Sequence, residues 1–286
     1  MMKRALALCL LLMLLVPCAW AESDIHMPRA GFAVAAPENP KAGGKVCLYA
    51  AADENSDVMM RYYSGAPVEV LEITEGGAFA RVKSGEPGAT IAGYMRTGDL
   101  AYGEAAAREV PLCYEAVQFA EAAPIYSYCD ARGAVIGAIK MTQFYSICGK
   151  NDSGMAQIFE HSGVADADFG FVNVNVPMLY REFEDEPHTY AVPPLAGELT
   201  REEAYEAAIA CLLDGSADTY GFMGRLPEHL RGEAGLRSMD ADIRLWKQGE
   251  SVMWHIMLTD PENMDNNVSV TLMPEGEPRE VSRSNG

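Results

Sequence analysis

The feature that most constrains this chain is an internal repeat. Residues 64–85, SGAPVEVLEITEGGAFARVKSG, predict a β-hairpin, because apolar and polar residues alternate on either side of a Gly-Gly turn. Residues 143–159, QFYSICGKNDSGMAQIF, repeat that pattern. One register links the two copies at an offset of 76 or 77 residues, with these landmarks: Leu48 and Ile125, Val68 and Phe144, Ala80 and Ala156, Gly93 and Gly170. This register indicates a duplicated β domain.

The first residues carry the pattern of an export signal. Lys3 and Arg4 precede an apolar stretch over residues 5–16, and Ala19-Trp20-Ala21 follows. The stretch is shorter than the roughly 20 residues that span a bilayer. We therefore expect a secretory signal peptide over residues 1–21, with a membrane anchor or a lipid at Cys18 as alternatives. No later stretch is apolar enough to span, so we expect a secreted, extracellular protein, free or associated with the cell wall.

The charge of the expected mature chain limits its partners. It holds 20 basic and 41 acidic residues, a formal charge of −21. We exclude nucleic acid as a partner, since phosphate backbones are bound by clustered Lys and Arg.

The expected mature chain keeps five cysteines, and none of them forms a Cys-x-x-Cys pair: Cys47, Cys113, Cys129, Cys148 and Cys211. An odd number without that spacing supports neither a zinc ribbon nor a full disulfide framework. Cys129 and Cys148 lie within one repeat, and either a bridge between them or two buried thiols fits the sequence.

Composition divides the chain into successive segments. We expect a flexible leader at residues 22–43 and a first repeat at residues 44–103. A connector at residues 104–116 leads to a second repeat at residues 117–176, and an acidic linker follows at residues 177–198. Four prolines in the last of these predict that it has no regular element.

The sequence changes character at residue 199. Thr200 and Glu203 fit a capping box ahead of an amphipathic helix of about fourteen residues, which Gly215 is placed to end. Strand-like runs follow at residues 243–247, 251–258 and 268–273. Residues 199–286 are therefore expected to form a small α+β domain, a helix plus an antiparallel three-stranded meander.

The repeats resemble bacterial SH3-like (SH3b) domains. The resemblance is carried by an opening strand, a Gly-led strand, a Gly turn and a closing Gly-aromatic pair: Val46-Cys47-Leu48-Tyr49, Gly65 to Leu71, Gly76-Gly77 and Gly93-Tyr94-Met95 in the first copy, with Ile125-Tyr126, Phe144 to Ile147, Met155 to Ile158 and Gly170-Phe171-Val172 in the second. The closing aromatic is Tyr94 or Phe171, where the family usually has Trp.

That resemblance implies a mainly β chain with two SH3-like β-barrels in tandem. It also implies a groove in which aromatic side chains bind a peptidoglycan stem peptide or an envelope protein partner. The candidates for this ligand-binding groove are Tyr62, Tyr63 and Tyr94 in the first copy and Tyr126, Tyr128 and Tyr145 in the second.

The C-terminal segment resembles modules of the PepSY type found in exported bacterial proteins. The resemblance is carried by Leu199-Thr200-Arg201-Glu202-Glu203-Ala204, and by the Trp-bearing run Val252-Met253-Trp254-His255-Ile256. In an alternating strand His255 would face opposite to Trp254.

The sequence shows no pattern typical of a hydrolase. Gly-x-Ser-x-Gly is missing, and Cys211 falls on the apolar stripe of the expected helix. The histidines are isolated from one another: His26, His161, His188, His229 and His255. Residues 260–267 lack the spacing of a calcium-binding EF-hand loop. We therefore expect no catalytic residues, no metal site and no cofactor.

These observations favour an exported, non-catalytic envelope protein that binds peptidoglycan peptides or a surface protein through its SH3-like modules. Two alternatives stay open. One is a regulator or inhibitor of an exported protease that acts through residues 199–286. The other is a cell-wall hydrolase whose catalytic residues are dispersed in the sequence.

Overall fold

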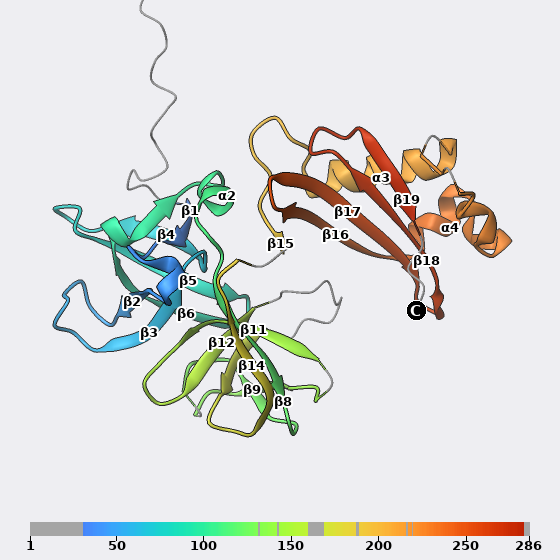
Figure 1. Ribbon diagram of the computed structural model, residues 1–286. Coiled ribbons are helices and arrows are strands. Elements are labelled where there is room, and N and C mark those ends of the chain that lie inside the picture. Colours follow the sequence, from blue (N-terminus) through green and yellow to red (C-terminus); the bar gives the residue numbers. More distant parts are fainter. Residues whose placement is uncertain are drawn as a thin grey trace, which may run out of the picture.

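The computed structural model describes residues 31–130, 132–141, 143–159, 169–186, 189–215, 217–218 and 220–282 (Figure 1). The chain is mainly β, and its described strands pair antiparallel in two sheets of fourteen and five strands. The expected signal peptide, Cys18, His26, His161 and His188 lie outside the described residues.

The larger sheet consists of two strand sets, which we call the first and second copy. The first copy contains β1 (Gly31–Ala35), β2 (Lys45–Tyr49), β3 (Val58–Tyr63), β4 (Pro67–Ile73), β5 (Phe79–Glu86), β6 (Ala89–Arg96) and β7 (Leu100–Tyr102). The second contains β8 (Tyr114–Phe119), β9 (Pro124–Tyr126), β10 (Val135–Ala138), β11 (Phe144–Lys150), β12 (Met155–Phe159), β13 (Gly170–Asn173) and β14 (Met178–Glu184). Short helical turns lie between strands: η2 (Pro40–Ala42), η3 (Thr97–Asp99) and α2 (Ala106–Glu109).

Each strand pairing of the first copy has a counterpart in the second. In the first copy β1 pairs with β4 and β7, β2 with β3 and β6, and β5 with β4 and β6. In the second, β8 pairs with β11 and β14, β9 with β10 and β13, and β12 with β11 and β13. The registers agree too, since Tyr49 pairs with Tyr94 and Tyr126 pairs with Phe171. β11 also pairs with β3, which joins the two copies.

Both expected hairpins are confirmed, as β4–β5 and as β11–β12. Gly76 and Gly77 have φ values of 86° and 73° in the first turn, a left-handed conformation that glycine adopts without the Cβ penalty.

Three expectations for this region are corrected. The leader is not irregular throughout, because Gly31–Ala35 forms β1 between β4 and β7. Residues 177–198 contain regular structure despite their prolines, since Met178–Glu184 forms β14 against β8. The described strands follow an open path rather than closing into barrels, with β10 at one end and β7 at the other.

The smaller sheet has the order β15 (Tyr190–Ala191), β16 (Asp240–Gln248), β17 (Ser251–Asp260), β18 (Asn263–Leu272) and β19 (Pro278–Ser282). It extends the expected three-stranded meander by one strand at each edge. Figure 1 shows α3 (Arg201–Asp214) and α4 (Glu233–Arg237) on one side of this sheet. The single-turn helices η4 (Met223–Arg225) and η5 (Glu228–Leu230) precede α4.

The expected fourteen-residue helix is confirmed as α3. Thr200 and Glu203 form a reciprocal capping box at its start, and Gly215, with φ 70°, caps its end. Ala208, Ile209 and Leu212 of α3 are buried in one core with Trp254 and Ile256 of β17. That core fixes which face of the sheet the helix covers.

A largely buried ion pair links α2 to the segment that leads into the C-terminal unit. The guanidinium of Arg108, in α2, binds the Glu198 carboxylate, with 2.8 Å between Nη1 and Oε1. Arg108 also donates to the Pro193 carbonyl at 3.2 Å, and Lys247 of β16 donates to the Arg108 carbonyl. The hydrogen bond from Arg108 lowers the pKa of Glu198 despite partial burial of the carboxylate.

Among the described helices, none has the length and apolarity to cross a bilayer.

We predict that Thr200→Ala lowers the free energy of unfolding by about 1 kcal/mol, because the amide of Glu203 loses its capping oxygen. Thr200→Ser keeps that oxygen and is expected to retain nearly all of the stability. Urea denaturation of both variants measures the difference, and equal losses for Ala and Ser would contradict the capping role.

Candidate functional site

The six tyrosines expected to line a binding groove do not share one surface. Tyr62, Tyr63 and Tyr145 are buried. Tyr94 and Tyr126 are half-buried, and Tyr128 is 41% exposed. No single groove therefore gathers these six side chains.

The buried tyrosines are held through their hydroxyl groups. The Tyr62 hydroxyl donates to Gln157 Oε1 at 2.6 Å, and the Tyr145 hydroxyl accepts from the Lys140 amide at 2.8 Å. The Tyr63 hydroxyl donates to the Glu115 carboxylate. Burial raises the pKa of Tyr62 and of Tyr63, and the Glu115 hydrogen bond raises that of Tyr63 further. These three side chains are structural.

Tyr126 and Tyr128 lie near the closing aromatic of the second copy. Tyr126 pairs with Phe171 across β9 and β13, and the ring centroids of Tyr128 and Phe171 are 6.4 Å apart. Tyr128 borders an open depression that also contains Asp130 and Asp152. Of the six candidates, Tyr128 is the one whose ring is exposed to solvent.

A buried carboxylate joins the two copies. Glu115 on β8 accepts from Tyr63 on β3, from Lys150 on β11, and from Arg181 on β14, whose Nε lies 2.9 Å from Oε2. Burial by itself would raise the pKa of Glu115, but the hydrogen bonds from Lys150 and Tyr63 and the charges of Lys150 and Arg181 outweigh it and lower the pKa. Lys45 stands over the Tyr63 ring at 5.0 Å. We call this group the Glu115 network.

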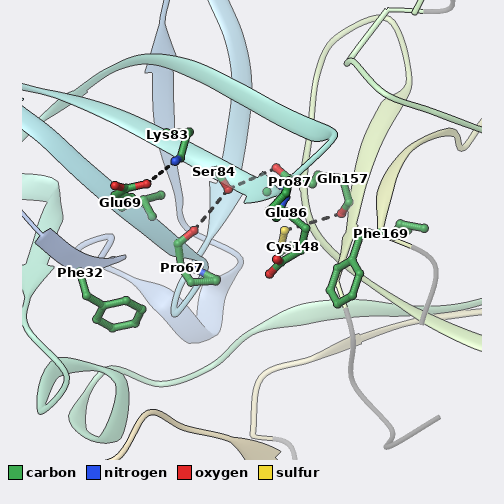
Figure 2. A pocket seen from close by; sticks show the side chains of 13 residues that line it. Phe32, Pro67, Glu69, Lys83, Ser84, Glu86, Pro87, Cys148, Gln157 and Phe169 are labelled. Carbon is green, nitrogen blue, oxygen red and sulfur yellow. Dashed lines mark hydrogen bonds and ion pairs between the residues drawn. The ribbon is translucent and has the colours of Figure 1, made fainter. Parts of the chain in front are cut away.

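A pocket of about 360 Å³ lies between the copies (Figure 2). The first copy contributes Phe32, Pro67, Val68, Glu69, Lys83, Ser84, Gly85, Glu86 and Pro87, and the second contributes Cys148, Gln157, Ile158 and Phe169. Lys83 and Glu69 form an ion pair across β4 and β5. A mostly apolar pocket of this volume at the junction of two units is typical of ligand-binding sites. We call it the junction pocket.

Gln157 and Ser84 supply buried polar groups to the junction pocket, which Glu69, Lys83 and Glu86 also line. Gln157 Oε1 accepts from Tyr62 and lies 3.4 Å from the Ser84 hydroxyl, which is also 3.3 Å from the Pro67 carbonyl oxygen. The Gln157 amide nitrogen lies near Gly85, where a Cβ would stand 3.0 Å from it. The pocket thus has a side-chain amide among its apolar walls.

Sequence reasoning missed this pocket because the pattern predicts each hairpin by itself and not how the two hairpins face each other, and because two of the aromatic walls come from segments without a pattern. Phe32 lies in the expected leader, and Phe169 precedes a short strand at the end of the second copy. The duplication was the available signal, since two adjacent copies must share an interface.

The five cysteines of the expected mature chain are all free thiols. Burial raises the pKa of Cys113 to about 11 and that of Cys148 to about 12. Both therefore stay protonated at neutral pH, unlike reactive cysteines. Within the described ranges, no three His, Cys, Asp or Glu side chains gather as metal ligands.

His255 faces opposite to Trp254 on β17, as expected. Trp254 is buried in the core with α3, whereas His255 is half-buried on the other face of the sheet. Burial lowers the pKa of His255; the Asp242 charge opposes this shift and the Arg244 charge adds to it.

No protein-family model matches the chain, and no curated protein matches it in sequence. Similar solved structures include NlpC2 from Trichomonas vaginalis, with 13% identity, a TM-score of 0.24, and coverage of 64% of this chain and 55% of that one. NlpC1 from the same organism has 13% identity and a TM-score of 0.24, covering 65% and 53%. The chain thus matches about half the length of these proteins, and a likeness at that TM-score carries no weight for fold or activity.

We predict that Glu115→Gln lowers the free energy of unfolding by about 3 kcal/mol at pH 7, because Lys150 and Arg181 lose their shared counter-charge. Glu75→Gln, in the exposed β4–β5 turn, is the matched control and is expected to change little. Denaturant titration compares the two variants, and a Glu115 variant as stable as the control would show that the network does not hold the copies together.

The lowered pKa of Glu115 also predicts a pH dependence. Because that pKa is lower in the folded protein than in the unfolded chain, the stability from Glu115 is present above the unfolded pKa of about 4.3 and is lost as pH falls through the folded value. The free energy of unfolding should therefore fall more steeply between about pH 5 and pH 3 in the parent than in Glu115→Gln. If the free energy of unfolding has the same pH dependence in the parent and in Glu115→Gln, Glu115 is not the group responsible for the loss of stability at low pH.

Proposed function

We propose that this chain is an exported, non-catalytic cell-envelope protein that binds a peptide in its junction pocket, with peptidoglycan stem peptides as the leading ligand class. In this proposal the two copies are SH3-like units and residues 199–286 form a PepSY-like unit. The export pattern of residues 1–21 and the quoted sequence resemblances support these assignments.

The junction pocket carries the proposal. Phe32, Pro67 and Phe169 give it apolar walls, and the Gln157 amide offers a donor within it. A short peptide with a small apolar side chain beside a carbonyl or carboxylate oxygen matches both features. Because Tyr62 and Tyr63 are buried, the ligand contacts move from the expected tyrosines to the junction.

The position of the pocket supports a ligand-binding role for the two copies rather than a role as passive spacers. Ser84 comes from the first copy and Gln157 from the second, and they meet at the floor of the pocket. The Glu115 network fixes the neighbouring strands β3 and β11. The pocket is therefore held open before a ligand arrives, which lowers the entropy cost of binding.

We predict that residues 22–286 are retained on purified peptidoglycan and that Phe169→Ala reduces the affinity by about tenfold, the usual effect of removing an aromatic contact. Phe144→Ala is the matched control, because Phe144 is 53% exposed and packs against Tyr180 outside the pocket. The affinity is measured with soluble stem-peptide fragments by calorimetry. Absence of retention, or equal affinities for the Phe169 variant and the parent, would overturn the proposal.

A further inference from the structure

A second pocket, of about 270 Å³, lies beside the junction pocket. One wall comes from the first copy and includes Val34 of β1 and Ala107 of α2, and another comes from residues 190–193, which contain β15. The two pockets share Phe32 and Pro67. We call the second pocket the outer pocket.

Strand pairing places both pockets on one face of the larger sheet. Phe32 and Val34 of β1 pair with Glu69 and Pro67 of β4, and Glu69 pairs with Lys83 of β5. Directly paired residues of antiparallel strands share a face, so these five side chains lie on the same side. Figure 2 shows Phe32 at the end of the junction pocket away from Phe169. The outer pocket continues from that end, over β1.

The wall formed by residues 190–193 is held from two directions. β15 pairs with β16, and the Val192 amide donates to the Leu245 carbonyl at 2.8 Å. Arg108 of α2 donates to the Pro193 carbonyl at 3.2 Å. The outer pocket is therefore held by contacts within the chain, and a strand of the C-terminal sheet supplies one of its walls.

The outer pocket differs from the junction pocket in charge. Its described lining residues include no Asp, Glu, Lys, Arg or His, whereas Glu69, Lys83 and Glu86 line the junction pocket. A charged group placed in an apolar pocket loses its hydration without gaining a partner. The outer pocket therefore suits an uncharged residue with a short apolar side chain.

The strand spacing sets the length of a peptide that reaches both pockets. Neighbouring strands lie about 4.8 Å apart, so β5 and β1, on either side of β4, are separated by about 10 Å. An extended peptide rises about 3.3 Å per residue and covers that distance in about three residues. A tripeptide therefore fills the junction pocket alone, and a fourth and fifth residue reach the outer pocket.

We infer that the junction pocket and the outer pocket are adjoining subsites for one extended peptide of about five residues, and that the outer subsite takes an uncharged residue with a short apolar side chain. The inference rests on the proposed peptide binding in the junction pocket. It makes residues 190–193, and through them the C-terminal unit, part of the ligand-binding surface.

The probes are a stem tripeptide and the pentapeptide that extends it by two alanine residues, both amidated at the C-terminus so that they differ in length and not in terminal charge. Calorimetry with residues 22–286 should give about tenfold tighter binding for the pentapeptide, the gain expected from burying two further methyl groups. A pentapeptide amide with glutamate as its last residue should bind no better than the tripeptide, because the outer pocket offers its charge no partner.

Ala191→Leu tests the outer pocket from the β15 side. Ala191 is an exposed residue that lines the pocket, so leucine fills the pocket without disturbing a buried core. The variant should bind the tripeptide as the parent does and lose the tenfold gain for the pentapeptide. Ala107→Leu fills the pocket from α2 and should give the same result. Ala196→Leu is the matched control, because Ala196 is also exposed and does not line the pocket.

The outcomes separate this inference from the proposed function. Tripeptide binding that Phe169→Ala weakens, without a gain for the pentapeptide in the parent, would overturn the two-subsite inference and leave binding in the junction pocket intact. A gain that survives in both Ala191→Leu and Ala107→Leu, or that the glutamate peptide shows equally, would also overturn the inference alone. Absence of binding by all three peptides would overturn both.

Discussion

The buried Glu115 carboxylate connects the strands of the two copies. It accepts hydrogen bonds from the Tyr63 hydroxyl of the first copy and from Lys150 and Arg181 of the second, so that β3, β8, β11 and β14 meet at one point. The alternation of side chains on β3 extends its effect, because Tyr63 reaches Glu115 while its neighbour Tyr62 reaches Gln157 on the opposite side. The same strand thus supports the ion network and the floor of the junction pocket, and the shape of that pocket depends on how the two copies are joined.

Local signals in the sequence were sufficient for the local elements. The Gly76-Gly77 turn, the repeated hairpin and the capping box at Thr200 each depend on a few neighbouring residues, and each is confirmed. β1 and β14 were missed because their pairings join distant residues: β1 lies between β4 and β7, and β14 lies against β8. Prolines near residues 177–194 suggested a linker, yet the run between Pro177 and Pro187 is long enough to form an edge strand.

The candidate site was less predictable than the fold. Residue type alone suggested that tyrosines line a ligand-binding groove. The burial of Tyr62, Tyr63 and Tyr145 depends on hydrogen-bond partners of their hydroxyl groups, which no local sequence pattern reveals. The junction pocket combines residues from both copies, which lie far apart in the sequence. His255 is the informative exception, because the alternation around Trp254 placed it correctly on the face of the sheet opposite α3.

The contact between β3 and β11 joins dissimilar surfaces, since a strand of the first copy meets a non-equivalent strand of the second. The counterpart of β3 in the second copy is β10, which ends the described strand path with Val135 and Ile136 exposed. Such a head-to-tail contact is not self-complementary, unlike the twofold interface of a symmetric dimer. The duplication therefore has a direction along the chain, because the surface that the first copy offers to the second differs from the surface that the second offers to the first.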